Sequence, residues 1–512
     1  MYSSVLALFS RALRVDVRSR GSHLARLGLV VAIYLSVLQV QMMAIWGGVG
    51  APGLSFFRSI LWLNLIVLTL VGIGAFSSTI TEEKEEDSLG LLRMAGVDSL
   101  GLLLGKTGGR LIQALTLVIV QYPFTLLSIT LGGVSIAQIQ AAYFALAAYV
   151  LLLAGLGSLC STIAQTSRGS ARLLVLVVAF HGVAAGLSAA WVFELAFTGQ
   201  TSLFQPLANL LSTSCVFLQT GEILTTGFAS SVWTVQVISN GAGGLLCFLL
   251  SWALFDVCSR SPHTEPMSRG FLTTGLGGFR WFSPGRTWTN PLAWKDYHFS
   301  TGGIAGLIIR AACYLGLFAV IWWFSPPATE LKDMCRVFLA IQLAALPFDA
   351  SLLISRAMQD EVRGQTIPAL VMLPRSVPAI VYSKLGGALR GLIPGLVCLV
   401  IAFAGSDLLP EWIESSNWWQ YSYVVAFLPN LVVLPHLTAV IALVARWGAT
   451  PLAIVGLYVI QSAEGMLFMP LFLLTGTFSM ELYMVLMGTT NVLLCVACHF
   501  EVMRRFRKLA EK

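Results

Sequence analysis

The chain has 512 residues, of which 57% are hydrophobic and only 11% are charged, and its mean hydropathy is +0.81. Soluble domains carry about 25% charged residues, so this composition excludes a water-soluble globular protein and indicates an integral membrane protein. The basic residues behind the net charge of +7 lie between apolar runs, which favours a membrane protein over a nucleic-acid-binding protein.

The apolar runs are long enough to cross a bilayer, since a membrane-spanning helix needs about 20 apolar residues. The first run begins near Leu27 and is longer than the apolar core of a cleavable signal peptide, so we expect it to remain as the first span. The sequence therefore predicts an all-α polytopic membrane protein. About twelve spans are expected, at residues 25–46, 56–77, 110–132, 137–163, 171–193, 233–257, 303–324, 336–355, 386–406, 421–445, 452–475 and 481–502.

The basic residues predict the orientation of these spans, because lysine and arginine are enriched on the cytoplasmic side of a membrane. If the N-terminus lies inside, only Arg58, Lys332 and Arg336 of the 31 basic residues fall on the outer side. An even number of spans then returns the chain to the same side. We therefore expect both termini to be cytoplasmic.

The spans divide into two halves of six. Residues 1–258 form the first half and residues 290–512 the second, and the stretch between them, 259–289, is rich in Ser, Gly, Pro and Thr, which is typical of a linker. In the first half, residues 195–231 form a long outer stretch with apolar patches, which we interpret as a partly re-entrant or interfacial helix.

An internal repeat relates the inner loops after spans two and eight, at about residues 80–100 and 358–378. The two loops align without a gap at an offset of 278 residues, and the matched pairs include acids, hydroxyls, leucines and lysines. An ungapped match in the same topological position predicts two halves in the same orientation. The matched residues are Glu83 with Glu361, Ser88 with Thr366, Leu92 with Leu370, Met94 with Met372, and Lys106 with Lys384.

Each repeated loop opens with acidic residues and continues with apolar residues at helical spacing, such as Leu89 and Leu92. In the second loop the corresponding residues are Ile367, Leu370 and Val371. A residue that ends a helix follows in each loop, Gly96 in the first and Pro374 in the second. The pattern predicts a short helix that lies on the inner face of the membrane with its polar side toward the cytoplasm.

The second loop resembles the signature of ABC-2 type permeases, through Glu361, Arg363, Gly364, Thr366, Leu370, Leu373, Pro374, Ser376 and Lys384. The first loop matches through Glu83, Ser88, Leu91, Leu92, Gly105 and Lys106, but it carries Gly96 where the family has proline. The segment that starts Asn290-Pro291 and continues to Trp294-Lys295-Asp296 also resembles the elbow helix that opens such permeases. The resemblance is sharp over about 30 residues in each half.

The resemblance implies that residues 82–98 and 360–376 are coupling helices, which dock on separate ATPase subunits and pass their movement to the spans. It implies a fused two-half permease in the inner membrane of a bacterium, with two ATPase partners that bind ATP, and export of an unknown substrate as the commoner direction. The chain itself would carry no catalytic residue and no cofactor. The residues expected at the coupling loops are Glu82, Glu83, Ser88, Leu92, Lys106, Glu361, Arg363, Thr366, Leu370, Pro374 and Lys384.

No nucleotide-binding or metal-binding motif emerges from the sequence. The run Gly101 to Thr107 resembles a phosphate-binding loop, but only three leucines separate its glycines where the motif requires four residues. We interpret it as the entrance to a span. The nine cysteines lie mostly inside apolar runs and show no zinc-ligand spacing.

Glu464 lies in the middle of span eleven, where a carboxylate is costly and therefore a candidate for transport. A structural carboxyl that is protonated or hydrogen-bonded is the alternative. His181 on span five is the nearest ionisable residue at the related position of the repeat, but it lies five residues away. If Glu464 binds a coupling ion, the chain would be a secondary transporter with a parallel 6+6 repeat. A membrane-embedded enzyme would need a cluster of catalytic side chains that the sequence does not supply.

Overall fold

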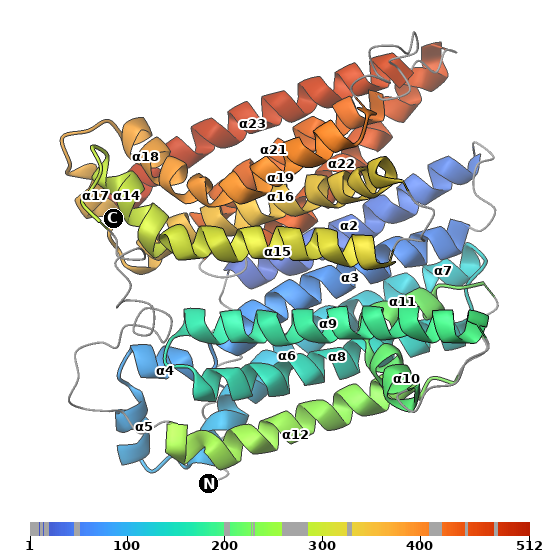
Figure 1. Cartoon of the computed structure of the whole chain (residues 1–512), viewed down its shortest axis with the longest axis horizontal. Helices are drawn as coiled ribbons and strands as arrows, with labels where there is room; N and C mark the ends of the chain where they lie inside the picture. The colour runs from blue at the N-terminus through green and yellow to red at the C-terminus, as the bar shows by residue number, and fades with distance from the viewer. Residues whose placement is uncertain are drawn as a thin grey trace. The chain divides into compact units, whose positions relative to one another are not determined.

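The computed structural model is built from α-helices, and it has no β-strand in the part of the chain that it describes (Figure 1). The described residues are 10, 14, 20–45, 52–198, 205–226, 228, 231–258, 285–324, 330–408, 422–445, 449–475 and 480–511. Most of the predicted linker, 259–289, lies outside them. The chain divides into two compact units, Met1–Pro266 and Met267–Lys512.

Ten helices among the described residues are long and apolar enough to cross a membrane. Two shorter apolar stretches, Arg26–Leu38 and Val432–Ala442, lie within the helices α2 and α21. This agrees with the prediction of a polytopic α-helical membrane protein.

In the described part of unit 1, six long helices alternate with five short ones (Figure 1). Residues 195–231, for which a partly re-entrant or interfacial helix was predicted, hold two of the short helices, α10 and α11. The elements are α2 (Arg20–Ile45), α3 (Pro52–Ser77), α4 (Thr81–Glu85), α5 (Leu89–Met94), α6 (Ser99–Thr125), α7 (Leu127–Thr130), α8 (Ile136–Ile163), α9 (Ser167–Thr198), α10 (Gln205–Ser214), α11 (Val216–Ile223) and α12 (Val235–Cys258).

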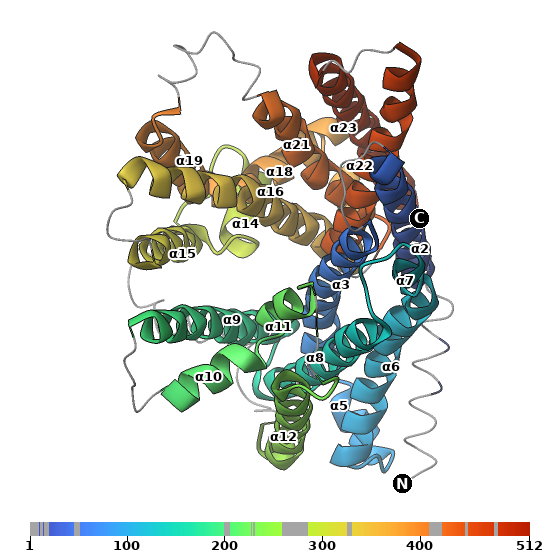
Figure 2. The same ribbon diagram turned by 90° about the vertical axis from the view of Figure 1, so that its right-hand side faces the viewer.

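The helix α8 forms the centre of unit 1 and contacts α3, α6, α9, α11 and α12 (Figure 2). Small residues allow the closest of these contacts. A Cβ atom on Gly155 would lie 2.0 Å from the carbonyl oxygen of Gly244 on α12, and one on Gly157 would lie 2.3 Å from the Phe76 side chain on α3. Helices in membranes associate through such small residues, because van der Waals packing replaces the hydrophobic effect there.

Unit 2 opens with the elbow-like helix α14, which is capped by the Asn290 side chain. The helix α16 contacts α18, α19 and α21, and α21 contacts α22 and α23. The elements are α14 (Pro291–Phe299), α15 (Gly303–Phe324), α16 (Leu331–Arg363), α17 (Ile367–Val371), α18 (Val377–Leu389), the 3₁₀ turn η2 (Arg390–Leu392), α19 (Ile393–Gly405), α21 (Ser422–Ala442), α22 (Ala449–Thr475) and α23 (Met480–Ala510).

Several helices extend beyond the predicted spans. The helix α6 starts at Ser99, about three turns before the predicted 110, and α18 starts at Val377 instead of 386. Hydropathy detects only the apolar part of a helix, whereas these first turns carry lysines that are paired with glutamates in the fold. The helix α6 is continuous through Gly101 to Thr107, so this run is not a phosphate-binding loop.

Candidate functional site: two related charged loops

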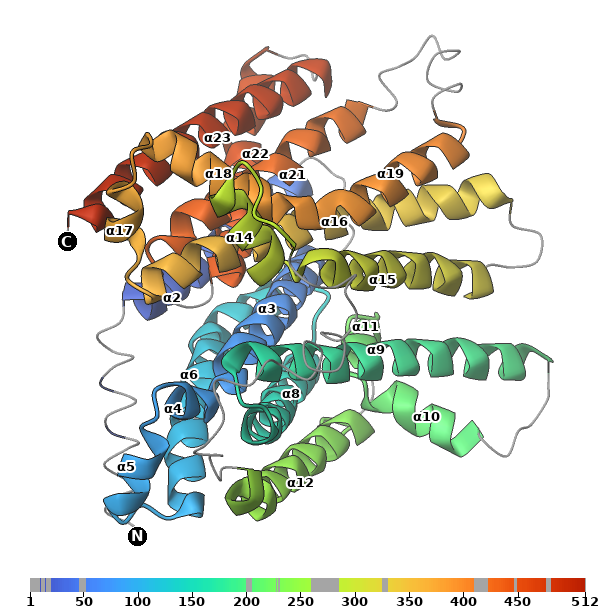
Figure 3. The same ribbon diagram turned by 60° about the vertical axis from the view of Figure 1, so that its left-hand side comes forward.

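The first charged loop joins α3 to α6 and contains the short helices α4 and α5 at one end of unit 1 (Figure 3). Glu83 on α4 forms an ion pair with Lys106 on α6 and accepts a hydrogen bond from the Ser88 hydroxyl. The Lys106 and Glu83 side chains are 24% and 12% exposed. Glu83 therefore links α4, the turn before α5, and α6.

The second charged loop joins α16 to α18 and contains α17 at one end of unit 2 (Figure 3). Glu361 in the last turn of α16 accepts hydrogen bonds from Lys384 Nζ on α18 at 2.7 Å, from Lys295 Nζ on α14 at 2.9 Å, and from the Thr366 hydroxyl. Lys384 also donates to Asp296 Oδ2 on α14 at 2.8 Å. Its side chain is fully buried, and the two carboxylates are each 4% exposed.

A buried lysine is stable only when its charge and its N–H groups are matched. Lys384 meets this condition because two carboxylates flank it, and their charge-assisted hydrogen bonds are stronger than neutral ones. Burial raises the pKa of the Asp296 carboxyl, and the attraction of Lys384 and Lys295 opposes that rise. The cluster therefore holds α14, α16 and α18 together as one electrostatic unit.

The turns before α5 and α17 share the same backbone conformation. Asp87 has φ = 51° and Gln365 has φ = 52°, both in the left-handed region that non-glycine residues rarely adopt. In each turn the next amide donates to the carbonyl of the loop glutamate, at 3.0 Å in the first loop and 3.1 Å in the second. Sequence similarity at the offset of 278 residues is thus matched by the same local geometry.

Each loop is also hydrogen-bonded to the end of a distant helix of its own unit. Lys84 donates to the carbonyls of Thr162 and Ala164 at the end of α8, at 2.5 and 3.0 Å. In unit 2, Gln359 Nε2 donates to the carbonyl of Ala445 after α21, at 3.1 Å. The base of the first loop is therefore anchored to α6 and α8, and the base of the second to α14, α18 and the end of α21.

The tips of the two loops expose large apolar side chains. Met94 is 79% exposed and Met372, its partner in the repeat, is 86% exposed, and Leu91 is exposed as well. The first residues of the short helices, Leu89 and Ile367, are instead buried. An apolar tip on a firmly anchored base is suited to docking into a groove of a partner protein.

The other predicted loop residues take supporting positions. Glu82 pairs with Arg110 on α6 at 2.5 Å. Leu92 and Leu370 pack against buried apolar clusters beneath their helices. Arg363 lies exposed at the end of α16, and Pro374 lies exposed in the connection between α17 and α18.

Lys295 and Asp296 were not predicted from the sequence to belong to the second charged loop. Both belong to the segment that resembles an elbow helix, so the motif itself was visible. Their contacts with Glu361 and Lys384 join residues 66 and 88 positions apart, which no local pattern reveals. The corresponding part of unit 1, residues 12–21, lies mostly outside the described residues.

The two intramembrane candidates lie in different units. Glu464 on α22 is buried beside Thr490 of α23, and its Oε2 atom has no hydrogen-bond partner among the described residues. His181 lies on α9 beside the backbone of Ser214, and its Nε2 atom likewise has no partner in the described part of the chain.

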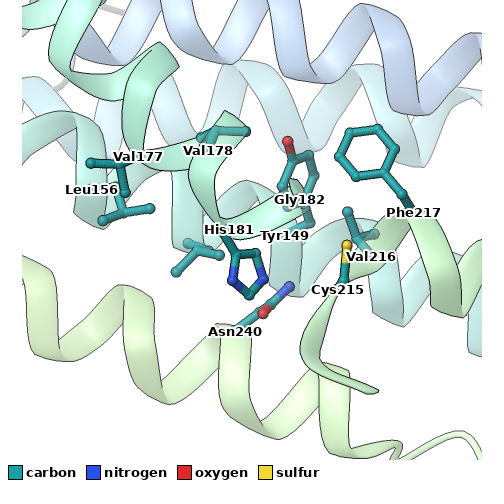
Figure 4. Close-up of a pocket in the computed structure, with 11 residues that line it drawn as sticks. Tyr149, Leu156, Val177, Val178, His181, Gly182, Cys215, Val216, Phe217 and Asn240 are labelled. Atoms are coloured by element: carbon teal, nitrogen blue, oxygen red, sulfur yellow. The ribbon is translucent and has the colours of Figure 1, made fainter. Parts of the chain in front are cut away.

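His181 lines a small cavity of about 30 Å³ in unit 1, between α8, α9, α12 and the start of α11 (Figure 4). The His181 ring and the Asn240 amide lie next to each other there, and Tyr149 and Phe217 contribute part of the wall (Figure 4). The volume suits about one water molecule. A larger substrate would not fit in this cavity as it stands.

A comparison of the chain with models of known protein families and with curated proteins finds no match. The two loops are therefore the feature of the molecule that bears most directly on its function.

Proposed function

We propose that the chain is the membrane-spanning permease of an ATP-binding cassette transporter of the ABC-2 type. The observation that carries the proposal is the recurrence of one loop in both units, with a short helix, an exposed methionine tip and a glutamate–lysine pair at its base. A dimeric ATPase presents two equivalent grooves, and two equivalent loops on one chain would supply one docking helix for each.

The anchoring of the loops supports a role in transmitting force. Glu83 and Glu361 connect the helix before each loop to the helix after it, so a displacement of the tip would move both. Ion pairs with little exposure resist shear better than solvated ones, because separating them exposes buried charge. In this proposal the ATPase pushes on the loops, and the spans respond as rigid bodies.

The rest of the proposal follows the layout of the chain. Twelve spans would result if α2 and α21 also cross the bilayer, with six in each half and both termini in the cytoplasm. Two ATPase subunits would bind the ATP, and the substrate, which we expect to be exported, would cross the cytoplasmic membrane of a bacterium. The chain itself would not be an enzyme.

The test is a pull-down of the whole chain in a mild detergent, with mass spectrometry and an ATPase assay on the eluate. We expect a soluble ATPase to co-purify with the wild type. Replacing both tip methionines, Met94→Asp and Met372→Asp, should remove it, because a desolvated charge opposes an apolar contact. Each single variant should retain part of the ATPase, since one tip remains.

The matched control is Ile136→Asp, which places the same charge at an exposed apolar position at the opposite end of α8. This variant should keep its ATPase. Co-purification that survives the double tip variant, or that is lost equally in the control, would contradict docking through the loop tips.

The observation that favours an ion-coupled secondary transporter is the buried Glu464, with one carboxylate oxygen unpartnered among the described residues. A carboxylate at this depth is costly unless it binds a proton or a cation. Under this alternative, the purified chain alone would transport on an ion gradient in liposomes, and Glu464→Gln would stop it. Under the permease proposal the chain alone would be inactive.

A further inference from the structure

Two arginines from separate parts of unit 2 contact the segment that precedes α14, and a third arginine belongs to that segment. Arg286 lies in this segment, and the guanidinium of Arg390 lies 4.1 Å from the centre of the Trp288 ring. Arg375, from the turn before α18, donates to Asn290 Oδ1 at 3.4 Å. The two contacts add the charges of Arg375 and Arg390 to the charge that Arg286 places on the segment itself.

Among the described residues, these three arginines differ from the neighbouring cations in having no acidic partner. Lys295 and Lys384 are paired with carboxylates. Arg286, Arg375 and Arg390 are exposed, and none of them forms an ion pair with a carboxylate in the described part of the chain. The patch thus presents uncompensated positive charge, which favours an anionic ligand.

Aromatic side chains surround the same patch. The Trp288 ring lies 5.2 Å from the Tyr297 ring and 6.0 Å from the His298 ring, measured between ring centres. Phe299 is exposed, and the apolar span α15 begins four residues later with exposed isoleucines such as Ile304. Aromatic rings beside the first turns of a span are typical of the interface between lipid headgroups and acyl chains.

We propose that Arg286, Arg375, Arg390 and Trp288 form a cationic surface that binds the headgroup of an anionic phospholipid. Guanidinium groups match phosphate oxygens through paired hydrogen bonds, and anionic lipids attract cations near the membrane surface. The exposed apolar side chains of Phe299 and α15 are suited to contact acyl chains. A phospholipid has acyl chains as well as a phosphate, whereas a free phosphate or an acidic protein surface has none. This inference is independent of the transport function proposed above.

The test measures lipid retention by the full chain in a neutral detergent, with native mass spectrometry during titration with phosphatidylglycerol or phosphatidylcholine. We expect the wild type to retain phosphatidylglycerol preferentially. Arg390→Gln and Arg286→Gln should each weaken that retention by about fivefold, since a cation near an anionic surface contributes about 1 kcal/mol. Because Arg286 lies outside any helix, its variant keeps the test valid if Arg390→Gln fails to fold.

The matched control is Arg507→Gln, an exposed arginine in the last turn of α23 that has no carboxylate or aromatic partner in the described part of unit 2. Its retention of phosphatidylglycerol should equal that of the wild type. An equal loss in the control would show general charge attraction and overturn the proposal. The proposal would also be overturned if glycerol 3-phosphate displaced the lipid at the same concentration. The same holds if the arginine variants lost protein partners but no lipid.

Discussion

Glu83–Lys106 and Glu361–Lys384 join the same two positions of the repeat, yet their surroundings differ. In unit 1 the pair is partly exposed, whereas in unit 2 the lysine is fully buried and also bonded to Asp296 of α14. The backbone of the two turns is nearly identical. The repeated motif therefore fixes the backbone conformation of each loop. The elements packed against the loop determine how deeply its glutamate–lysine pair is buried.

The largest expected effect is a difference in stability between variants of Lys384 and Lys106. Lys384→Met leaves Asp296 and Glu361 buried together, and we expect a loss of about 3–5 kcal/mol in the free energy of unfolding. Lys106→Met should cost only about 1 kcal/mol, because its pair is partly hydrated. Thermal unfolding of the two purified variants in detergent measures this difference.

A triple variant that should regain the lost stability is the control for this comparison. Adding Asp296→Asn and Glu361→Gln to Lys384→Met removes the uncompensated charges and should recover most of the lost stability. Equal losses for the two single lysine variants would contradict the role assigned to burial.

A smaller effect concerns Asp296, which has no described counterpart in unit 1. Its pKa is raised by burial above the ordinary value of 3.8, so the folded state binds this proton more tightly than the unfolded state. The resulting stabilisation is present at acidic pH and is lost as the pH rises from 3.8 through the folded pKa. Relative to Asp296→Asn, the wild type should therefore lose stability over this range.

Parallel stability curves for the wild type and Asp296→Asn would contradict this assignment. Glu330→Gln is a control of opposite sign, because the neighbouring Lys332 lowers the pKa of Glu330. The wild type should gain stability relative to that variant as the pH rises through the ordinary glutamate range.

The smallest expected effect tests what the two loops share. Asp87→Gly and Gln365→Gly should each stabilise the protein by up to about 1 kcal/mol, since glycine adopts a positive φ without the steric cost of a Cβ atom. The two gains should be similar, because the two turns have the same geometry. Gly96→Ala, at φ = 78°, should instead lower the unfolding temperature. Unequal gains would show that the turns differ in strain despite their matching angles.

The sequence correctly predicted a short helix in each loop, because the signals are local. The expected ranges 82–98 and 360–376 are not single helices, however, since a residue with positive φ interrupts each, Asp87 in the first and Gln365 in the second. The spacing of Leu89 and Leu92 and the positive φ of Gly96 correspond to a helix that ends at Met94. The repeat at an offset of 278 residues also placed the glutamate, hydroxyl and lysine of each loop in related positions. The ends of the spans were predicted less well, since helices such as α16 continue through polar turns to Arg363.

Composition, apolar run length and residue spacing are enough to identify an α-helical membrane protein with two related loops, because these signals act within a few turns of the chain. Which lysine is buried depends instead on contacts between distant segments. Asp296 reaches Lys384 across 88 residues, and α14 can approach α18 closely because a side chain at Gly387 would collide with Ala293. Such contacts depend on how separate helices pack, and packing is a property of the folded chain rather than of any segment in it.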